Sequence, residues 1–141
     1  MSLLGISRFY LFGLGIFFLY LGANMFIKGP VECLLEHDLK IGGQPLSALA
    51  ELRAYYTGTL FLCSILFLRG GFHTHRTNDS LFFSFLLLGL FSVVRLYCHL
   101  VEGPALLPHA EIIWSLEVLG TAVSLLLYIL VPDQSKSIKK A

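Results

Sequence analysis

Residues 81–101 read LFFSFLLLGLFSVVRLYCHLV, and this stretch decides the fold. It holds a single charged residue, Arg95, and as a helix it is long enough to cross the roughly 30 Å hydrocarbon core of a bilayer. It lacks the strict alternation of apolar and polar residues that a barrel strand needs. Because a helix in lipid pairs its own backbone groups, the stretch predicts a membrane-spanning helix.

Three further apolar stretches accompany it, over residues 9–27, 47–68 and 112–131. Of the 141 residues, 56% are hydrophobic and only 13% are charged, and the mean hydropathy is +0.78. A soluble domain of this size could not hide so much apolar surface. We therefore predict an all-α, single-domain integral membrane four-helix bundle over residues 1–141, with up-down-up-down topology.

Lysine and arginine are distributed unevenly over the segments that join the spans. One side would hold six of them and the other side two, and the cytoplasmic side normally carries the excess. We therefore predict that both termini are cytoplasmic in a multi-pass protein of a bacterial inner membrane or an equivalent membrane. The six are Arg8, Arg69, Arg76, Lys136, Lys139 and Lys140, and the two are Lys28 and Lys40.

The first outer loop contains a helix-start pattern, Gly29-Pro30-Val31-Glu32. Proline is favoured at the first position of a helix, so a short separate helix over about residues 30–37 is expected. Its apolar residues would share a face and lie on the membrane surface.

Four charged residues interrupt the spans, although a charge inside a bilayer is costly and faces a bundle interior or a partner. Two of them fall near the outer end of the second span, one near that of the third and one near that of the fourth. Because successive helices alternate in direction, we expect these residues to meet at one depth. Tyr55 shares a helix face with Glu51, and His99 shares one with Arg95. The candidate ligand- or partner-binding residues are therefore Glu51, Arg53, Tyr55, Arg95, His99 and Glu117.

Two interpretations of this set stay open from sequence alone. It is either a buried ion-pair network that fixes the helix register, or a polar pocket for a lipid-like head group or a partner. In both cases an unpaired arginine at this depth would be strongly destabilising. We therefore predict that Arg95 pairs with Glu117 or Glu51 across helices.

Small and hydroxyl-bearing residues recur at helical spacing in three spans. Pairs or ladders of small residues favour close packing within the bundle, with a dimer face as the alternative. They are Gly15 with Gly22, Ala50 with Ala54 and Gly58, and Gly120 with Ser124. A polar stripe of Glu117, Thr121, Ser124 and Tyr128 could bond a ligand, but such hydroxyls more often bond their own backbone.

Three classes of function compete. The first is a binding protein, a subunit or assembly factor of a membrane complex, whose partners would be the lipid bilayer, a lipid-like ligand, a membrane protein or a second copy. The alternative is a membrane enzyme acting on a lipid, sterol or quinone, with Glu51 or Glu117 as acid and base. A transporter is disfavoured because four spans show no internal repeat. A net charge of +1 excludes a nucleic-acid footprint, and no motif predicts a cofactor or a metal site.

Two motifs also carry a family resemblance. Residues 51–58, ELRAYYTG, and residues 95–104, RLYCHLVEGP, resemble the second and third helices of the domain of unknown function 4345. That family looks like a relative of the DoxX-type four-helix proteins. The resemblance implies a four-helix bundle with a polar site at Glu51, Arg53, Arg95 and Glu117, and it implies no established activity. Thr57 departs from the family pattern, which has a second small residue there.

Overall fold

The computed structural model describes the backbone of residues 2–34, 46–102 and 110–131, and the side chains of residues 2–27, 54–97, 100 and 114–131. In these ranges the protein is all-helical, with four long helices: α1 (Leu3–Leu34), α2 (Leu46–Phe72), α3 (Thr77–Glu102) and α4 (Ala110–Leu130). A short 3-10 helix, η1 (Thr74–Arg76), joins α2 to α3. Even α4, with 21 residues, is about 31 Å long at ~1.5 Å per residue.

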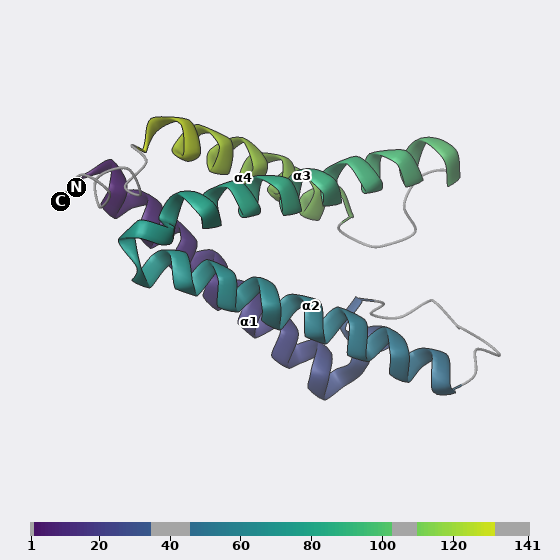
Figure 1. Cartoon of the computed structure of the whole chain (residues 1–141). Helices are drawn as coiled ribbons and strands as arrows, with labels where there is room; N and C mark the ends of the chain where they lie inside the picture. The colour runs from purple at the N-terminus through teal and green to yellow at the C-terminus, as the bar shows by residue number, and fades with distance from the viewer. Residues whose placement is uncertain (1, 35–45, 103–109, 132–141) are drawn as a thin grey trace.

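The helices form two pairs, α1 with α2 and α3 with α4 (Figure 1). The pairs meet at the end that carries the start of α1, η1 and the end of α4, which we call the connection end. They diverge toward the other end, the far end, where α2 and α4 begin and α3 ends (Figure 1). The buried hydrophobic cluster lies entirely in the half nearer the connection end, and it comprises Leu11, Phe18, Cys63, Phe67, Leu81, Leu88, Leu127 and Val131.

Glycine lets α1 approach α2 closely. A Cβ atom at Gly15 would lie 2.7 Å from Cγ of Leu68, and one at Gly22 would lie 2.9 Å from Cδ1 of Phe61. The buried carbonyl of Gly15 also accepts a hydrogen bond of 2.8 Å from the hydroxyl of Ser64. Small residues thus allow the two backbones to come together, as predicted for the first span.

The other two small-residue motifs behave differently from each other. A Cβ at Gly120 would lie 2.8 Å from Cδ1 of Leu88, so close packing within the bundle is confirmed there. At Gly58 no described atom lies within 4 Å of the added Cβ, and both Ala54 and Gly58 are exposed. The prediction of internal packing is therefore wrong for Gly58, because α2 turns this face away from α1.

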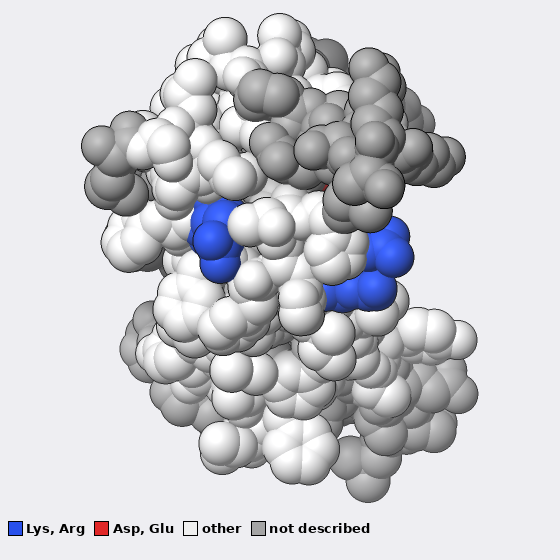
Figure 2. Space-filling view, turned by 60° about the vertical axis from the view of Figure 1, so that its left-hand side comes forward, with Lys and Arg blue, Asp and Glu red and all other residues white. Residues whose placement is uncertain are grey.

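Hydrogen bonds join α1 to the last residues of α2 at the connection end. Arg8 donates from Nε to the carbonyl of Gly71 at 2.8 Å and from Nη2 to that of Phe72 at 3.2 Å. These are among the last carbonyls of α2, which have no partner inside the helix. Figure 2, which turns this side of the molecule forward, shows arginine as separate patches on a largely uncharged surface. The arginines near the α2–η1 junction are Arg8, Arg69 and Arg76.

Large apolar side chains cover the outside of the helices. Phe9 is 73% exposed, Ile129 is 68% exposed and Val93 is 62% exposed. Two described stretches, Leu3–Ile27 and Thr74–Tyr97, are long and apolar enough to span a membrane, and Trp114–Leu130 is a shorter apolar helix. The exposed apolar surface is what lipid-facing helices present.

The course of the chain around Pro30 differs from the sequence expectation. A separate helix over about residues 30–37 was expected, but α1 continues through Pro30 to Leu34, and residues 35–37 lie outside the described part. A proline inside a helix removes one backbone hydrogen bond and bends the axis, which does not have to end the helix. The ribbon of α1 changes direction close to its C-terminal end (Figure 1).

Candidate functional site

An ion pair joins α3 to α4 in the half of the molecule near the far end. Nε of Arg95 donates to both carboxylate oxygens of Glu117, at 2.9 Å to Oε1 and 2.8 Å to Oε2. Each residue lies seven positions from the far end of its helix, which is about 10 Å at ~1.5 Å per residue. The two depths match, and the predicted pairing of Arg95 with Glu117 is confirmed.

The two partners differ in exposure. The side chain of Glu117 is 10% exposed, while that of Arg95 is 38% exposed. The guanidinium group has five N–H donors, and this pairing uses only the one on Nε. Among the described residues no acceptor bonds Nη1 or Nη2 of Arg95. The carboxylate therefore bonds Arg95, and the other four donors of the arginine have no acceptor among the described residues.

Below this pair, the polar stripe of α4 divides into two kinds of contact. The hydroxyl of Thr121 bonds the backbone carbonyl of Glu117 at 2.7 Å, as expected for such residues. Ser124 instead reaches other helices: its Oγ lies 2.8 Å from the hydroxyl of Tyr10 on α1 and 2.8 Å from Oγ of Ser84 on α3. Tyr10 also donates to the carbonyl of Gly120 at 3.0 Å. This small network connects three helices.

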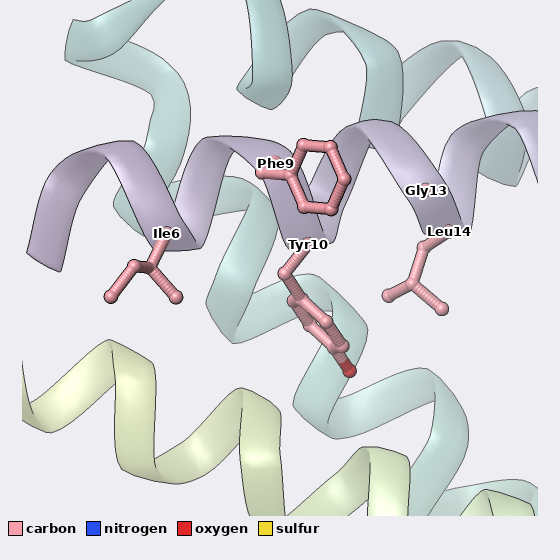
Figure 3. Close-up of a pocket in the computed structure, with 5 residues that line it drawn as sticks. All are labelled: Ile6, Phe9, Tyr10, Gly13 and Leu14. Atoms are coloured by element: carbon pink, nitrogen blue, oxygen red, sulfur yellow. The ribbon is translucent and has the colours of Figure 1, made fainter. Parts of the chain in front are cut away.

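A shallow apolar groove lies along α1 beside this network, with a volume of about 410 Å³. The side chains of Ile6, Tyr10 and Leu14 point from α1 toward α4 in Figure 3, and Phe9 and Gly13 complete the lining. Sequence reasoning missed Tyr10 and Ser84. A signal existed for both, because a hydroxyl inside an apolar span needs a partner, and Ser84 lies three helical turns from Arg95 on one face.

Of the remaining predicted site residues, only Tyr55 has a side chain in the described part, and no hydrogen bond joins it to Arg95 or Glu117. Tyr55 is 74% exposed and makes no hydrogen bond or ring contact with another described side chain. Glu51 and Arg53 belong to α2 and His99 belongs to α3, but their side chains lie outside the described part. The beginning of α2 and the end of α3 lie apart in Figure 1. No group of three metal-ligating side chains occurs among the residues that the structure describes.

Comparison with known proteins gives one match. A model of a family described as a domain of unknown function, DUF4345, matches residues 6–128. No curated protein and no solved structure matches the chain. The match covers most of the sequence, so the chain belongs to this family, and the resemblance predicted from two short motifs is confirmed. The relationship to DoxX-type proteins stays a prediction.

Proposed function

We propose that this member of the DUF4345 family is a multi-pass membrane protein that binds a lipid-like ligand or a membrane partner at the Arg95–Glu117 pair. One observation carries the proposal. The pair joins a nearly buried carboxylate to a partly exposed arginine with unused donors, in the half of the molecule that lacks the hydrophobic cluster. A purely structural pair needs no unused donors, whereas a binding site does.

The membrane part of the proposal has its own support. All four helices are long enough to cross the bilayer, and large apolar side chains face outward on each of them. Arginines gather at the connection end, which would then face the cytoplasm together with both termini. An up-down-up-down path follows from four crossings.

Labelling of single cysteines tests this topology. In a background without Cys33, Cys63 and Cys98, we expect Ser2→Cys and Asp79→Cys to react with an impermeant maleimide only after the membrane is opened. Both positions are exposed near the connection end. Reaction of either cysteine in intact cells would contradict the orientation.

Native mass spectrometry of the full chain tests the binding role. We expect wild-type protein, released from mild detergent, to retain a lipid-sized molecule or a partner subunit. The double variant Arg95→Leu with Glu117→Leu should lose it, and the control Arg69→Leu at the opposite end should keep it. Equal retention by all three proteins, or by none, would contradict a binding role for the pair.

A further inference from the structure

We propose that the Arg95–Glu117 pair binds the uncharged carbonyl group of a long-chain apolar molecule, such as a fatty acyl ester, in preference to a free carboxylate. This inference rests on the proposed function, since it names the ligand class of the same site. It follows from the donors that the site offers, from its charge and from its surroundings.

The donors call for an oxygen acceptor. Arg95 uses Nε for Glu117, and the amino groups Nη1 and Nη2 bond no described residue. Polar N–H groups left without an acceptor in apolar surroundings cost free energy. The side chain of Arg95 is 38% exposed, so an incoming oxygen atom could reach these amino groups and accept their hydrogen bonds.

The charge of the site selects between kinds of oxygen. Glu117 already balances the positive charge of Arg95, so the pair is formally neutral. A bound carboxylate would add an uncompensated negative charge in surroundings of low dielectric constant, and it would compete with Glu117 for the same guanidinium. An ester or ketone carbonyl accepts the same hydrogen bonds without either cost.

The surroundings select an apolar remainder of the ligand. The residues next to the pair along both helices are apolar and exposed: Val94 is 57% exposed, Leu116 is 60% exposed and Val118 is 47% exposed. A molecule whose carbonyl reaches Arg95 would therefore rest its body on apolar surface. A sugar or a nucleotide would place polar groups there without partners.

The chain contains its own reporter for this site. Trp114 is the single tryptophan, it is 38% exposed, and it lies one turn before Glu117 on α4. Bromine atoms quench tryptophan fluorescence on contact. Three probes share one brominated tail: methyl 9,10-dibromostearate, ionised 9,10-dibromostearate, and 9,10-dibromooctadecane, which has no oxygen.

The experiment uses the full chain in dodecylmaltoside micelles, with tryptophan octyl ester in the same micelles as the reference for non-specific quenching. We expect the methyl ester to half-saturate quenching at a concentration roughly tenfold below that of the other two probes, since a hydrogen bond to a charged donor supplies about this factor. The comparison among probes needs only the wild-type protein, so it does not depend on the folding of any variant.

Two variants locate the effect. The double variant Arg95→Leu with Glu117→Leu should lose the preference for the ester. Arg69→Leu at the connection end should leave all three probes unchanged. A preference for the carboxylate, or equal quenching by the three probes, would overturn the inference. Suppose that the inference about the ester is overturned in this way. If native mass spectrometry shows a molecule that the wild-type protein retains and the double variant loses, the proposed binding function still stands. If no such molecule is found, the proposed function and the inference about its ligand both fail.

Discussion

The two helix pairs of this protein differ in the kind of contact that predominates between their helices. Between α1 and α2, glycines face large apolar side chains, as Gly15 faces Leu68 and Gly22 faces Phe61. Between α3 and α4, polar side chains meet, as Ser84 meets Ser124 and Arg95 meets Glu117. Helices can associate through close packing at small residues or through hydrogen bonds between side chains, and each pair relies mainly on one of the two.

The kind of contact within a helix pair affects whether that pair can also bind a ligand. A glycine contact leaves no chemical group free, so the α1/α2 pair can only be a scaffold at Gly15 and Gly22. A polar contact can leave some hydrogen-bond donors without an acceptor. This is the case for the two amino groups of Arg95, which bond no described residue. The pair that packs less closely is thus the one that can bind something else.

The largest loss of stability is expected from Gly15→Val in the α1/α2 pair. The added atoms would meet Cγ of Leu68 at 2.7 Å and the backbone N of Leu68 at 3.1 Å, and the backbone cannot move away easily. We expect a loss of about 3 kcal/mol, at the upper end for overpacking. Thermal unfolding in detergent would measure it. Gly13→Val on the same helix is the control, because no described atom lies within 4 Å there. Equal losses in both variants would contradict the packing argument.

The next largest loss is expected from Arg95→Leu in the α3/α4 pair. It leaves the nearly buried carboxylate of Glu117 without its partner. We expect about 2 kcal/mol, less than for a fully buried pair because Arg95 is 38% exposed. The double variant with Glu117→Leu should recover at least half of that loss.

The exposed pair of Arg76 with Asp79 provides the control for this double-mutant cycle. Its atoms are 3.3 Å apart and its side chains are 45% and 71% exposed, so Arg76→Leu should cost under about 0.5 kcal/mol. A double variant no more stable than Arg95→Leu alone would show that the two residues are not coupled.

The smallest loss is expected from Tyr10→Phe, which removes the hydroxyl that links α1 to α4. Its bonds to the carbonyl of Gly120 and to Ser124 are the main polar contacts between those helices in the described residues. We expect about 1 kcal/mol, which is the typical net contribution of an intramolecular hydrogen bond. Tyr20→Phe is the control, since Tyr20 is 64% exposed. A loss no larger than that of the control would show that α4 is held by α3 alone.

Much of the site could be predicted because depth along a helix can be counted in the sequence. Arg95 and Glu117 lie equally far from the ends of helices that a short segment connects, and a charge in an apolar span needs a partner. The choice between Glu117 and Glu51 could not be made in this way, because both acids were expected at similar depth. The contacts of Ser124 could not be predicted either, because the sequence does not show whether a hydroxyl bonds the backbone of its own helix or a residue of another helix.

The sequence by itself determined that four apolar segments form helices, because only a helix satisfies the backbone of such segments in an apolar medium. Two short motifs, at residues 51–58 and 95–104, also indicated the family, whose model matches residues 6–128. The packing of the helices was needed to tell which small residues lie inside the bundle: Gly15 and Gly58 both belong to small-residue motifs, but a Cβ at Gly15 would meet Leu68, whereas one at Gly58 would have no described atom within 4 Å. The packing likewise places the hydrophobic cluster of the described residues near the connection end and leaves four donors of Arg95 without an acceptor among those residues. These features depend on how each helix is rotated about its axis and on the angle between the pairs, and both are set by all the side-chain contacts together.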